Sequence, residues 1–317
     1  MISRLLPLIG IAIFICILLG TDMAGISAAL SNASIFYIFV SSLLLVPVVL
    51  LKALKWKVLI KCHGVNYPLP KSVSAWLAGF SLGMVTPGRL GDLSRALCLK
   101  GRLDMGGSLT TVIIDRVVDV ALLFCLAIAG IAIFVTSYGW YWGMLLSFAM
   151  LFALFLALFF LLTKKGLAGL ILRPFFRKML PERYKPGISE AFNGFYRGLD
   201  AMRKRKGMLA FSVVLGLAAW LVSIMQYYFL ALALNLGIQL GFLAMIVPVT
   251  VLLDILPVSF SGIGTRDAAM VFFFSLAGLP AESAISFSLL ILFVSYLLLG
   301  LAGMAAWLRN PLRASAR

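Results

Sequence analysis

Charged residues are scarce in this 317-residue sequence, and acidic residues are the scarcest of them. Only 12% of the residues are charged, with 11 Asp and Glu against 27 Lys and Arg, whereas 63% are hydrophobic. Several apolar runs reach the ~20 residues that an α-helix needs to cross the hydrocarbon core of a bilayer. The composition therefore excludes an ordinary water-soluble protein and predicts an all-α polytopic membrane protein, organised as one integral membrane domain over residues 1–317.

Cysteine and histidine are also few. The cysteines Cys16, Cys62, Cys98 and Cys125 show no paired spacing, and the single histidine, His63, adjoins Cys62 with no second pair of ligands nearby. Because a structural zinc site takes four ligands, we expect no metal site, no disulfide framework and no cofactor. His63 is most simply interpreted as a solvated loop residue. The sequence also lacks the glycine-rich Lys-Ser/Thr loop that cradles nucleotide phosphates.

The net charge of +16 is concentrated in the segments between apolar runs, which argues against a nucleic-acid partner. Basic residues follow the second apolar run (Lys52, Lys55, Lys57, Lys61 and Lys71), lie between residues 164 and 206, and close the chain at Arg309, Arg313 and Arg317. The connectors near 22–34, 137–141, 235–239 and 278–283 contain no Lys or Arg. By the positive-inside rule, the basic segments and both termini are predicted to be cytoplasmic, in the inner (cytoplasmic) membrane.

Six apolar segments have the length of a transmembrane helix. They are residues 5–21, 35–54, 109–136, 142–162, 208–234 and 284–308. The first ends in Leu-Leu-Gly-Thr-Asp, a poor signal-peptide cleavage site, so we expect it to be a span.

Two further apolar stretches fit re-entrant hairpins better than crossings. The 14 residues of 72–85 reach only ~21 Å at 1.5 Å per residue, short of the ~30 Å core, and basic residues lie on both sides of them. We predict hairpins over 72–100 and 240–277 that enter from opposite faces. Each lies between two spans, so the repeats at about 35–136 and 208–308 are predicted to be inverted, which is a recurring plan of transporters.

The break of the first hairpin carries charge into an apolar region. In TPGRLGDLSRA, Thr86 is a candidate N-cap and Pro87 a first-turn residue, while Gly88 and Gly91 leave backbone N–H groups approachable. Arg89, Asp92 and Arg95 are spaced three apart, so on a helix they share a face and the aspartate can pair with either arginine. A helix N-terminus beside an arginine predicts an anion site, with phosphate as the candidate anion.

The second hairpin repeats this pattern. Pro257, Gly262 and Gly264 make the break, Thr265 is a candidate cap, and Arg266 and Asp267 follow in the first turn. We expect each break to present its own arginine. Paired Gly and Pro interruptions in corresponding segments point to a binding site between the repeats.

A third charged cluster lies in the span that begins near residue 109. Asp115 and Asp119 are four apart on one face, with Arg116 between them, and Asp254 precedes the second break. Ionisable groups at this depth bind substrate, ions or protons, or pair with one another. Asp115 and Asp119 are candidates to pair with Arg89 or Arg95, or to carry protons in coupling; the sequence leaves both roles open.

Three motifs resemble those of a known family. PGRLGDLSRA, DRVVDVALL and PVSFSGIGTRD are similar, in this order, to motifs of the lysylphosphatidylglycerol synthase transmembrane-region family, and the resemblance covers roughly residues 3–308. In the best-known relatives this region is fused to a soluble aminoacyl transferase domain and moves the modified phospholipid to the outer leaflet. Others are stand-alone proteins linked with hopanoid lipids or with glycan and polyprenyl-phosphate pathways. We expect the present chain to be a stand-alone member without the transferase domain, so the resemblance implies lipid translocation rather than lipid synthesis.

The basic segment 164–207 contains an amphipathic pattern. Its apolar residues recur at helical spacing (Ile188, Ala191, Phe192, Phe195, Leu199 and Met202), opposite Glu190, Arg197 and Lys204. We predict a cytoplasmic interfacial helix that lies on the inner leaflet, where it gathers acidic lipids or only sets the topology.

Three possible functions follow. The favoured one is a flippase-like transporter, not an enzyme, that moves an anionic or phosphate-bearing lipid between leaflets. The alternatives are an intramembrane enzyme that uses Asp115, Asp119 and a divalent metal on phospholipid or polyprenyl phosphate, or an accessory subunit of a lipid- or glycan-modifying enzyme. Membrane lipids are the expected partners.

Overall fold

The computed structural model of the chain describes residues 2–138, 142–167, 169, 185–255, 258–259 and 261–309. Its elements are α1 (Ile2–Leu19), α2 (Met23–Ser31), α3 (Ile35–Lys61), α4 (Leu69–Met84), the 3-10 segment η1 (Pro87–Leu99), α5 (Met105–Tyr138), α6 (Trp142–Thr163), α8 (Lys185–Arg203), α9 (Lys206–Ala233), α10 (Leu240–Asp254), α11 (Thr265–Leu276), α12 (Ala281–Ile291), the π-helical segment η3 (Leu292–Leu297) and α13 (Leu298–Arg309). Helices joined by short turns and loops make up these described ranges, which contain no named β-strand.

Five helices are long and apolar enough to cross a membrane. They are α3, α5 (over 105–133), α6, α9 and the continuous α12–η3–α13 rod. Each corresponds to one of the predicted spans to within a few residues, except that α3 continues to Lys61. A sixth crossing is added if α1 and α2 form one span, although they meet at 91°. The expected connector 22–34 contains α2, because Asp22 accepts hydrogen bonds from the N–H groups of Ala24 and Gly25 and starts a new helix. The protein is an all-α, multi-pass membrane protein, as predicted.

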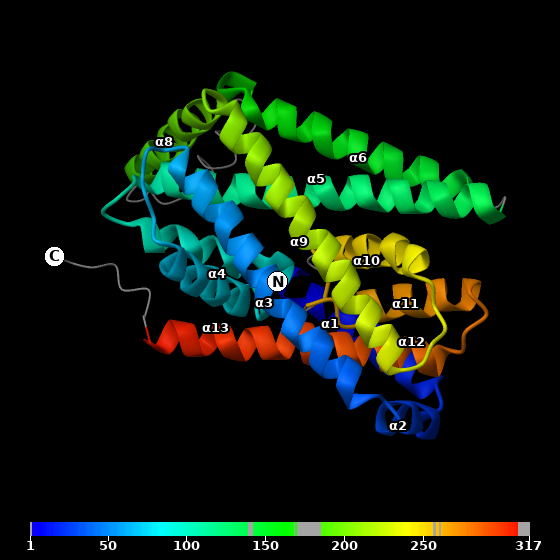
Figure 1. Cartoon of the computed structure of the whole chain (residues 1–317). Helices are drawn as coiled ribbons and strands as arrows, with labels where there is room; N and C mark the ends of the chain where they lie inside the picture. The colour runs from blue at the N-terminus through cyan, green and yellow to red at the C-terminus, as the bar shows by residue number, and fades with distance from the viewer. Residues whose placement is uncertain are drawn as a thin grey trace.

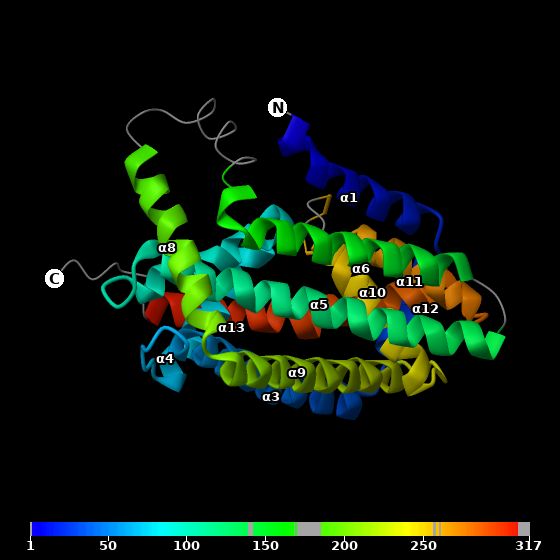
Figure 2. The ribbon, with the colours of Figure 1, turned by 90° about the horizontal axis from the view of Figure 1, so that it is seen from above.

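The long helices surround a packed interior. α3 and α9 lie against one another, α4 packs on α13, and α10 packs on α5. In both views α4 occupies the half of the molecule nearer α8, whereas α10 and α11 occupy the opposite half (Figures 1 and 2). The main apolar core lies where these elements meet and includes Trp76, Ile131 and Phe274.

The two interrupted segments meet in the interior. The Ser261 hydroxyl, in the second break, donates a hydrogen bond to the carbonyl of Met84 at the end of α4, at 2.8 Å. η1 packs on α4, and α10 contacts α11, so each break joins two neighbouring helical elements. The inverted repeat and the membrane face from which each hairpin enters stay predictions.

The segment after the first break is not the regular helix that was expected. η1 is a 3-10 helix, and Gly88 (φ 62°) and Arg89 (φ 55°) adopt left-handed backbone conformations inside it. Thr86 does not cap the first turn; its hydroxyl instead accepts a hydrogen bond from the N–H of Gly91 at 2.7 Å. A Cβ at Gly91 would lie 2.2 Å from the Leu82 carbonyl oxygen, so only glycine lets η1 approach α4 this closely.

The second break also differs in its cap. Gly264, with φ at 90°, precedes α11, and its N–H donates to the Asp267 carboxylate at 2.7 Å. The hydroxyl of Thr265, the expected cap, is instead hydrogen-bonded to that of Ser259 at 2.8 Å. The carboxylate of Asp267, the third residue of α11, therefore accepts the hydrogen bond of the backbone N–H before the helix, although a threonine hydroxyl was predicted as the cap. Pro257 lies outside the described residues.

The amphipathic segment forms α8, and its apolar face packs on protein. Tyr196, Leu199 and Met202 are buried with Leu59 and Ile114 of α3 and α5. The Thr110 hydroxyl donates to the Phe195 carbonyl at 3.0 Å, and Arg197 pairs with Asp104 at 2.9 Å. α8 therefore packs on the end of α5, whereas a helix that only lies on the leaflet would make no such contacts. The position of α8 at the membrane surface stays a prediction. Residues 168 and 170–184 and the side chain of Ile188 lie outside the described part of this segment.

His63 is less solvated than expected. It follows α3 as a loop residue, but it is half-buried, and its imidazole would lie 2.9 Å from a Cβ placed on Gly198 of α8. The histidine therefore lies beneath α8.

Candidate functional site

Charged residues of α3, η1, α5, α10 and α11, most of them buried, form several groups of ion pairs, here called the charge network. Its members are six cations (Lys52, Lys55, Arg89, Arg95, Arg116 and Arg266) and five carboxylates (Asp92, Asp115, Asp119, Asp254 and Asp267). All eight residues predicted for the site belong to it, although they do not converge on one point. Within this described network the cations outnumber the carboxylates by one.

Asp115 and Asp119 face α3 and bind its lysines. Lys55 lies 2.9 Å from Asp115 and 2.8 Å from Asp119, and Lys52 lies 2.7 Å from Asp119. Arg95 of η1 pairs with Asp115 at 3.0 Å, which is one of the predicted pairings. The spacing of four residues places both carboxylates on one side of α5, so one lysine can bridge them.

From the sequence, Lys52 and Lys55 were interpreted only as charges that set the cytoplasmic side, and their burial was not predicted. Their side chains are only 7% and 0% exposed, and they lie inside the bundle. The positive-inside rule counts charges and cannot distinguish a lysine on the lipid or water side of a helix from one that faces an acidic partner. The intramembrane aspartates of α5 were the available signal, because buried carboxylates require cationic partners.

Asp92 pairs with neither of the arginines on its own segment. Its carboxylate contacts the guanidinium of Arg116 on α5, and the Nε of Arg95 donates to the Asp92 backbone carbonyl at 3.3 Å. The prediction of an Asp92 pair with Arg89 or Arg95 is therefore wrong. It assumed isolated neighbours on one helix face, whereas α5 brings in a third cation.

Arg89 links the first break to the second half of the chain. Its guanidinium donates to the Tyr296 hydroxyl at 3.0 Å and lies 3.8 Å from the Asp254 carboxylate. Tyr296 in turn donates to Asp254, so α10 and η3 meet at the same point. Neither Tyr296 nor the Arg89–Asp254 pairing was predicted; a tyrosine inside an apolar span is a weak signal by itself.

Arg266 does not mirror Arg89. It is 2% exposed, its Nε donates to the Ser288 hydroxyl at 2.8 Å, and it lies 3.6 Å from Asp267. A Cβ on Gly262, whose φ is 79°, would lie 1.8 Å from the Asp254 carboxylate, so this glycine lets the chain pass the buried acid. The guanidinium of Arg266 is thus bound by Ser288 and Asp267, and it does not line the cavity described below.

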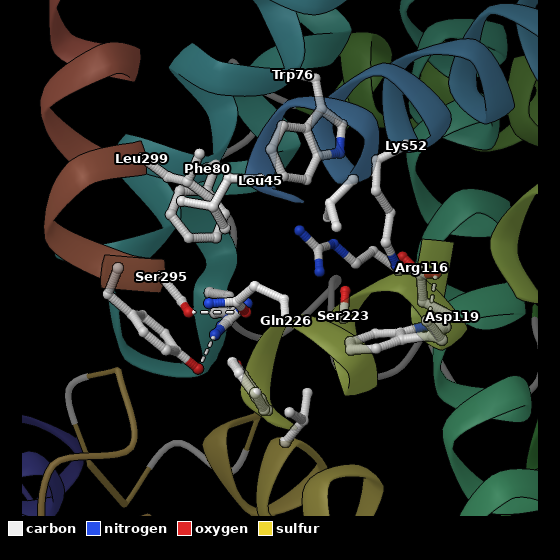
Figure 3. Close-up of a pocket in the computed structure, with 16 residues that line it drawn as sticks. Leu45, Lys52, Trp76, Phe80, Arg116, Asp119, Ser223, Gln226, Ser295 and Leu299 are labelled. Carbon is white, nitrogen blue, oxygen red and sulfur yellow. Dashed lines mark hydrogen bonds and ion pairs between the residues drawn. The ribbon is translucent and has the colours of Figure 1, made fainter. Parts of the chain in front are cut away.

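A cavity with charged, polar and apolar lining residues opens between these pairs, with a volume of about 90 Å³. A void needs only ~10–15 Å³ on this measure to hold a water molecule, so there is room for a larger polar group. Its charged lining residues are Lys52, Arg89, Arg116 and Asp119, and the lining is completed by Leu45, Val48, Trp76, Phe80, Trp220, Ser223, Gln226, Tyr227, Val251, Ser295, Tyr296 and Leu299. Figure 3 shows Arg116 extending into the cavity, with Gln226 and Ser295 on the facing side.

The lining favours an anion. Three cations and one carboxylate face the cavity, and the carboxylate of Asp119 already accepts from the Trp220 indole at 3.2 Å and binds two lysines. The side chains of Arg116 and Arg89 are 28% and 15% exposed, and their Nε atoms have no hydrogen-bond partner. Guanidinium groups with unused donors bind phosphate or carboxylate oxygens strongly.

Two further observations complete the description of the site. Within the described ranges, His, Cys, Asp and Glu nowhere gather in a group of three or more that could hold a metal ion. Gln226, Ser223, Ser295 and Trp220 were missed in the sequence, although a glutamine within an apolar span marks an interior polar position.

The fold and the cavity define a polytopic membrane protein with an internal cationic site. The family model for the lysylphosphatidylglycerol synthase transmembrane region matches residues 5–303. The chain belongs to this family, which is lipid-related, and the resemblance carried by the three motifs is confirmed.

Curated relatives extend over nearly the same length. A UPF0104 membrane protein from Methanocaldococcus jannaschii is 25% identical to this chain, covering 96% of it and 94% of the relative. A UPF0104 membrane protein from Methanothermobacter thermautotrophicus is 24% identical with the same coverage. One from Pyrococcus horikoshii is 23% identical and covers 96% of both chains.

Proposed function

We propose that this protein is a flippase-like transporter that moves an anionic, phosphate-bearing lipid between the leaflets of the cytoplasmic membrane. The observation that carries the proposal is the internal cavity, which is lined by the two arginines Arg89 and Arg116 together with Lys52. A lipid phosphate placed there replaces its hydration shell with charge-assisted hydrogen bonds, which lowers the cost of taking a charge into the bilayer.

The pairs around the cavity hold the two arginines in place. Asp92 orients Arg116, and Tyr296 with Asp254 orients Arg89. Each arginine keeps donors for a ligand, because one carboxylate does not saturate the five N–H groups of a guanidinium. Because the network contains one more cation than carboxylates, an anionic headgroup in the cavity would balance its charge.

The interrupted helices supply the elements that open and close the path. The two breaks meet through Ser261 and Met84 and lie in segments from opposite halves of the molecule. We propose that they belong to re-entrant hairpins of an inverted repeat, with both termini cytoplasmic, so that rearranging one hairpin against the other exposes the cavity to each leaflet in turn.

Reconstitution tests the proposal. Purified protein in liposomes containing a head-labelled fluorescent phosphatidylglycerol should make the inner-leaflet label accessible to dithionite, and the lipid should be chemically unchanged afterwards. Arg116→Gln should slow this exchange about tenfold, since it removes a charge-assisted contact. Arg309→Gln, at an exposed position outside the cavity, is the matched control and should leave the rate unchanged.

Other outcomes contradict the proposal in different ways. Metal-dependent turnover of the lipid, without exchange, would support the intramembrane enzyme. A lack of exchange by folded protein, restored by a co-reconstituted lipid- or glycan-modifying enzyme, would support an accessory subunit.

A further inference from the structure

A long apolar groove runs along the outer side of α5, separate from the charged cavity. Two adjoining hollows of about 530 and 450 Å³ share Ile114, Val117, Phe159, Thr163 and Leu199 in their linings, and together they are here called the α5–α6 groove. α5 forms its floor and α6 one wall, and α8 crosses one end (Figure 2). None of its lining residues lines the charged cavity.

The groove has the length of a lipid chain. On α5 its lining extends from Leu109 to Cys125. At 1.5 Å per residue these positions are ~24 Å apart, which exceeds the ~15 Å half-thickness of the hydrocarbon core. A complete acyl chain of one leaflet therefore fits along it.

The walls select hydrocarbon over water. The two hydroxyls that line the groove are already used, since Tyr196 donates to the Leu162 carbonyl at 2.6 Å and Thr163 donates to the Phe160 carbonyl at 2.8 Å. No side chain of α6, all of whose residues are described, is fully buried, and Phe159 and Leu162 pack only in part against the neighbouring helices. An apolar channel beside lipid loses dispersion contacts if it stays empty, and an acyl chain restores them.

The mouth of the groove is basic. Arg203 lines it, and Lys204, Arg205 and Lys206 follow as exposed residues between α8 and α9. Lys164 and Lys165 are also exposed and directly follow Thr163, which lines the groove on α6. Asp200 lies 3.5 Å from Arg203 and offsets one of these charges, so the mouth remains strongly cationic. Cations at the end of an apolar channel match an anionic headgroup on a lipid tail.

We infer that the α5–α6 groove is a second lipid site, which holds one acyl chain of an anionic phospholipid while the phosphate lies at the basic mouth formed by Arg203–Lys206 and Lys164–Lys165. This lipid is not the transported substrate. It stays in place and completes the packing of α6 and α8 on α5, so the inference does not depend on the proposed transport.

Native mass spectrometry of the purified full-length chain in mild detergent tests this site. With equal amounts of phosphatidylglycerol and phosphatidylcholine of the same chain length, the protein should retain one phosphatidylglycerol preferentially. Val117→Trp fills the groove and should reduce this retention at least tenfold. Leu154→Trp, at a lipid-facing position of α6 outside the groove (66% exposed), is the matched control and should retain the lipid.

A second variant keeps the test decisive if Val117→Trp does not fold. Arg203→Gln with Lys204→Gln changes only exposed side chains and should weaken phosphatidylglycerol about fivefold per charge, with no change for phosphatidylcholine. Equal retention by the two tryptophan variants, or equal retention of the two lipids by the unmodified chain, overturns the inference. Arg89→Ala should keep the groove lipid even where it abolishes transport, so a failure of either proposal can be distinguished.

Discussion

Arg89 offers the sharpest separation between ligand binding and internal charge pairing. Its guanidinium contacts Tyr296 at 3.0 Å and Asp254 at 3.8 Å, faces the cavity, and has an unpartnered Nε. If it holds a lipid phosphate, Arg89→Ala removes a charge-assisted contact worth roughly 1.5–3 kcal/mol, and lipid binding weakens by about tenfold to a hundredfold. Arg89→Lys keeps the charge but loses the planar fork, so its binding should fall between the two.

The same substitution also affects folding, and the two effects can be measured apart. Losing one partner of a fully buried ion pair costs about 3–5 kcal/mol. We expect a smaller loss for Arg89→Ala, because the pair is 3.8 Å apart, the arginine is 15% exposed, and Asp254 keeps its hydrogen bond from Tyr296. Adding Asp254→Ala removes the unpaired carboxylate and should recover most of the stability.

Transport by the double variant decides the question. The assay is dithionite-accessible exchange of labelled phosphatidylglycerol in liposomes, at matched amounts of folded protein. If Arg89 binds phosphate, Arg89→Ala/Asp254→Ala is stable but still impaired tenfold or more. Full exchange by this double variant would refute the phosphate site and leave Arg89 as a partner of Asp254 alone.

Three further predictions concern the break, the loop beneath α8 and the topology. Gly91→Ala should lower the thermal unfolding temperature by several degrees, because its Cβ meets a backbone oxygen at 2.2 Å, whereas Gly207→Ala, with nothing within 4 Å, should not. Burial lowers the pKa of His63 below its ordinary value of about 6.5, so the fold favours the neutral imidazole, and stability should fall as the pH drops below about 6.5; His63→Gln should reduce this slope, and an unchanged slope contradicts the argument. In a cysteine-free background, Lys100→Cys should label from the cytoplasmic side and Ala281→Cys from outside, and the reverse pattern at either position would make the inverted arrangement wrong.

Much of the architecture was predictable because a bilayer restricts the available structures. Residues exposed to hydrocarbon must satisfy their backbone hydrogen bonds internally, so long apolar runs become helices of nearly fixed length. The predicted spans at 142–162 and 208–234 differ from α6 and α9 by no more than two residues at either end. The three charged motifs were likewise recognisable, since ionisable residues within apolar runs are costly and require a reason.

The pairing of those charges depended on tertiary contacts. Local spacing on one helix predicted that Asp92 binds Arg89 or Arg95, but α5 supplies Arg116 and α10 supplies Asp254 as stronger neighbours. The left-handed backbone at Arg89 turns this residue away from the face it would share with Asp92 on a regular helix. Such a conformation persists only where surrounding contacts impose it, so local sequence does not reveal it.

The sequence by itself determined the membrane class, the approximate spans, the two interruptions and most of the charged residues of the interior. Only the tertiary structure decided that Lys52 and Lys55 lie inside the bundle, that Arg266 is enclosed, and that Arg89 and Arg116 share a cavity with Gln226 and Tyr296. The physical reason is the distance along the chain over which each interaction acts. Hydrophobic length acts along one helix and can be read from consecutive residues, whereas a buried charge takes the partner that packing brings within a few ångströms, from wherever in the chain that partner comes.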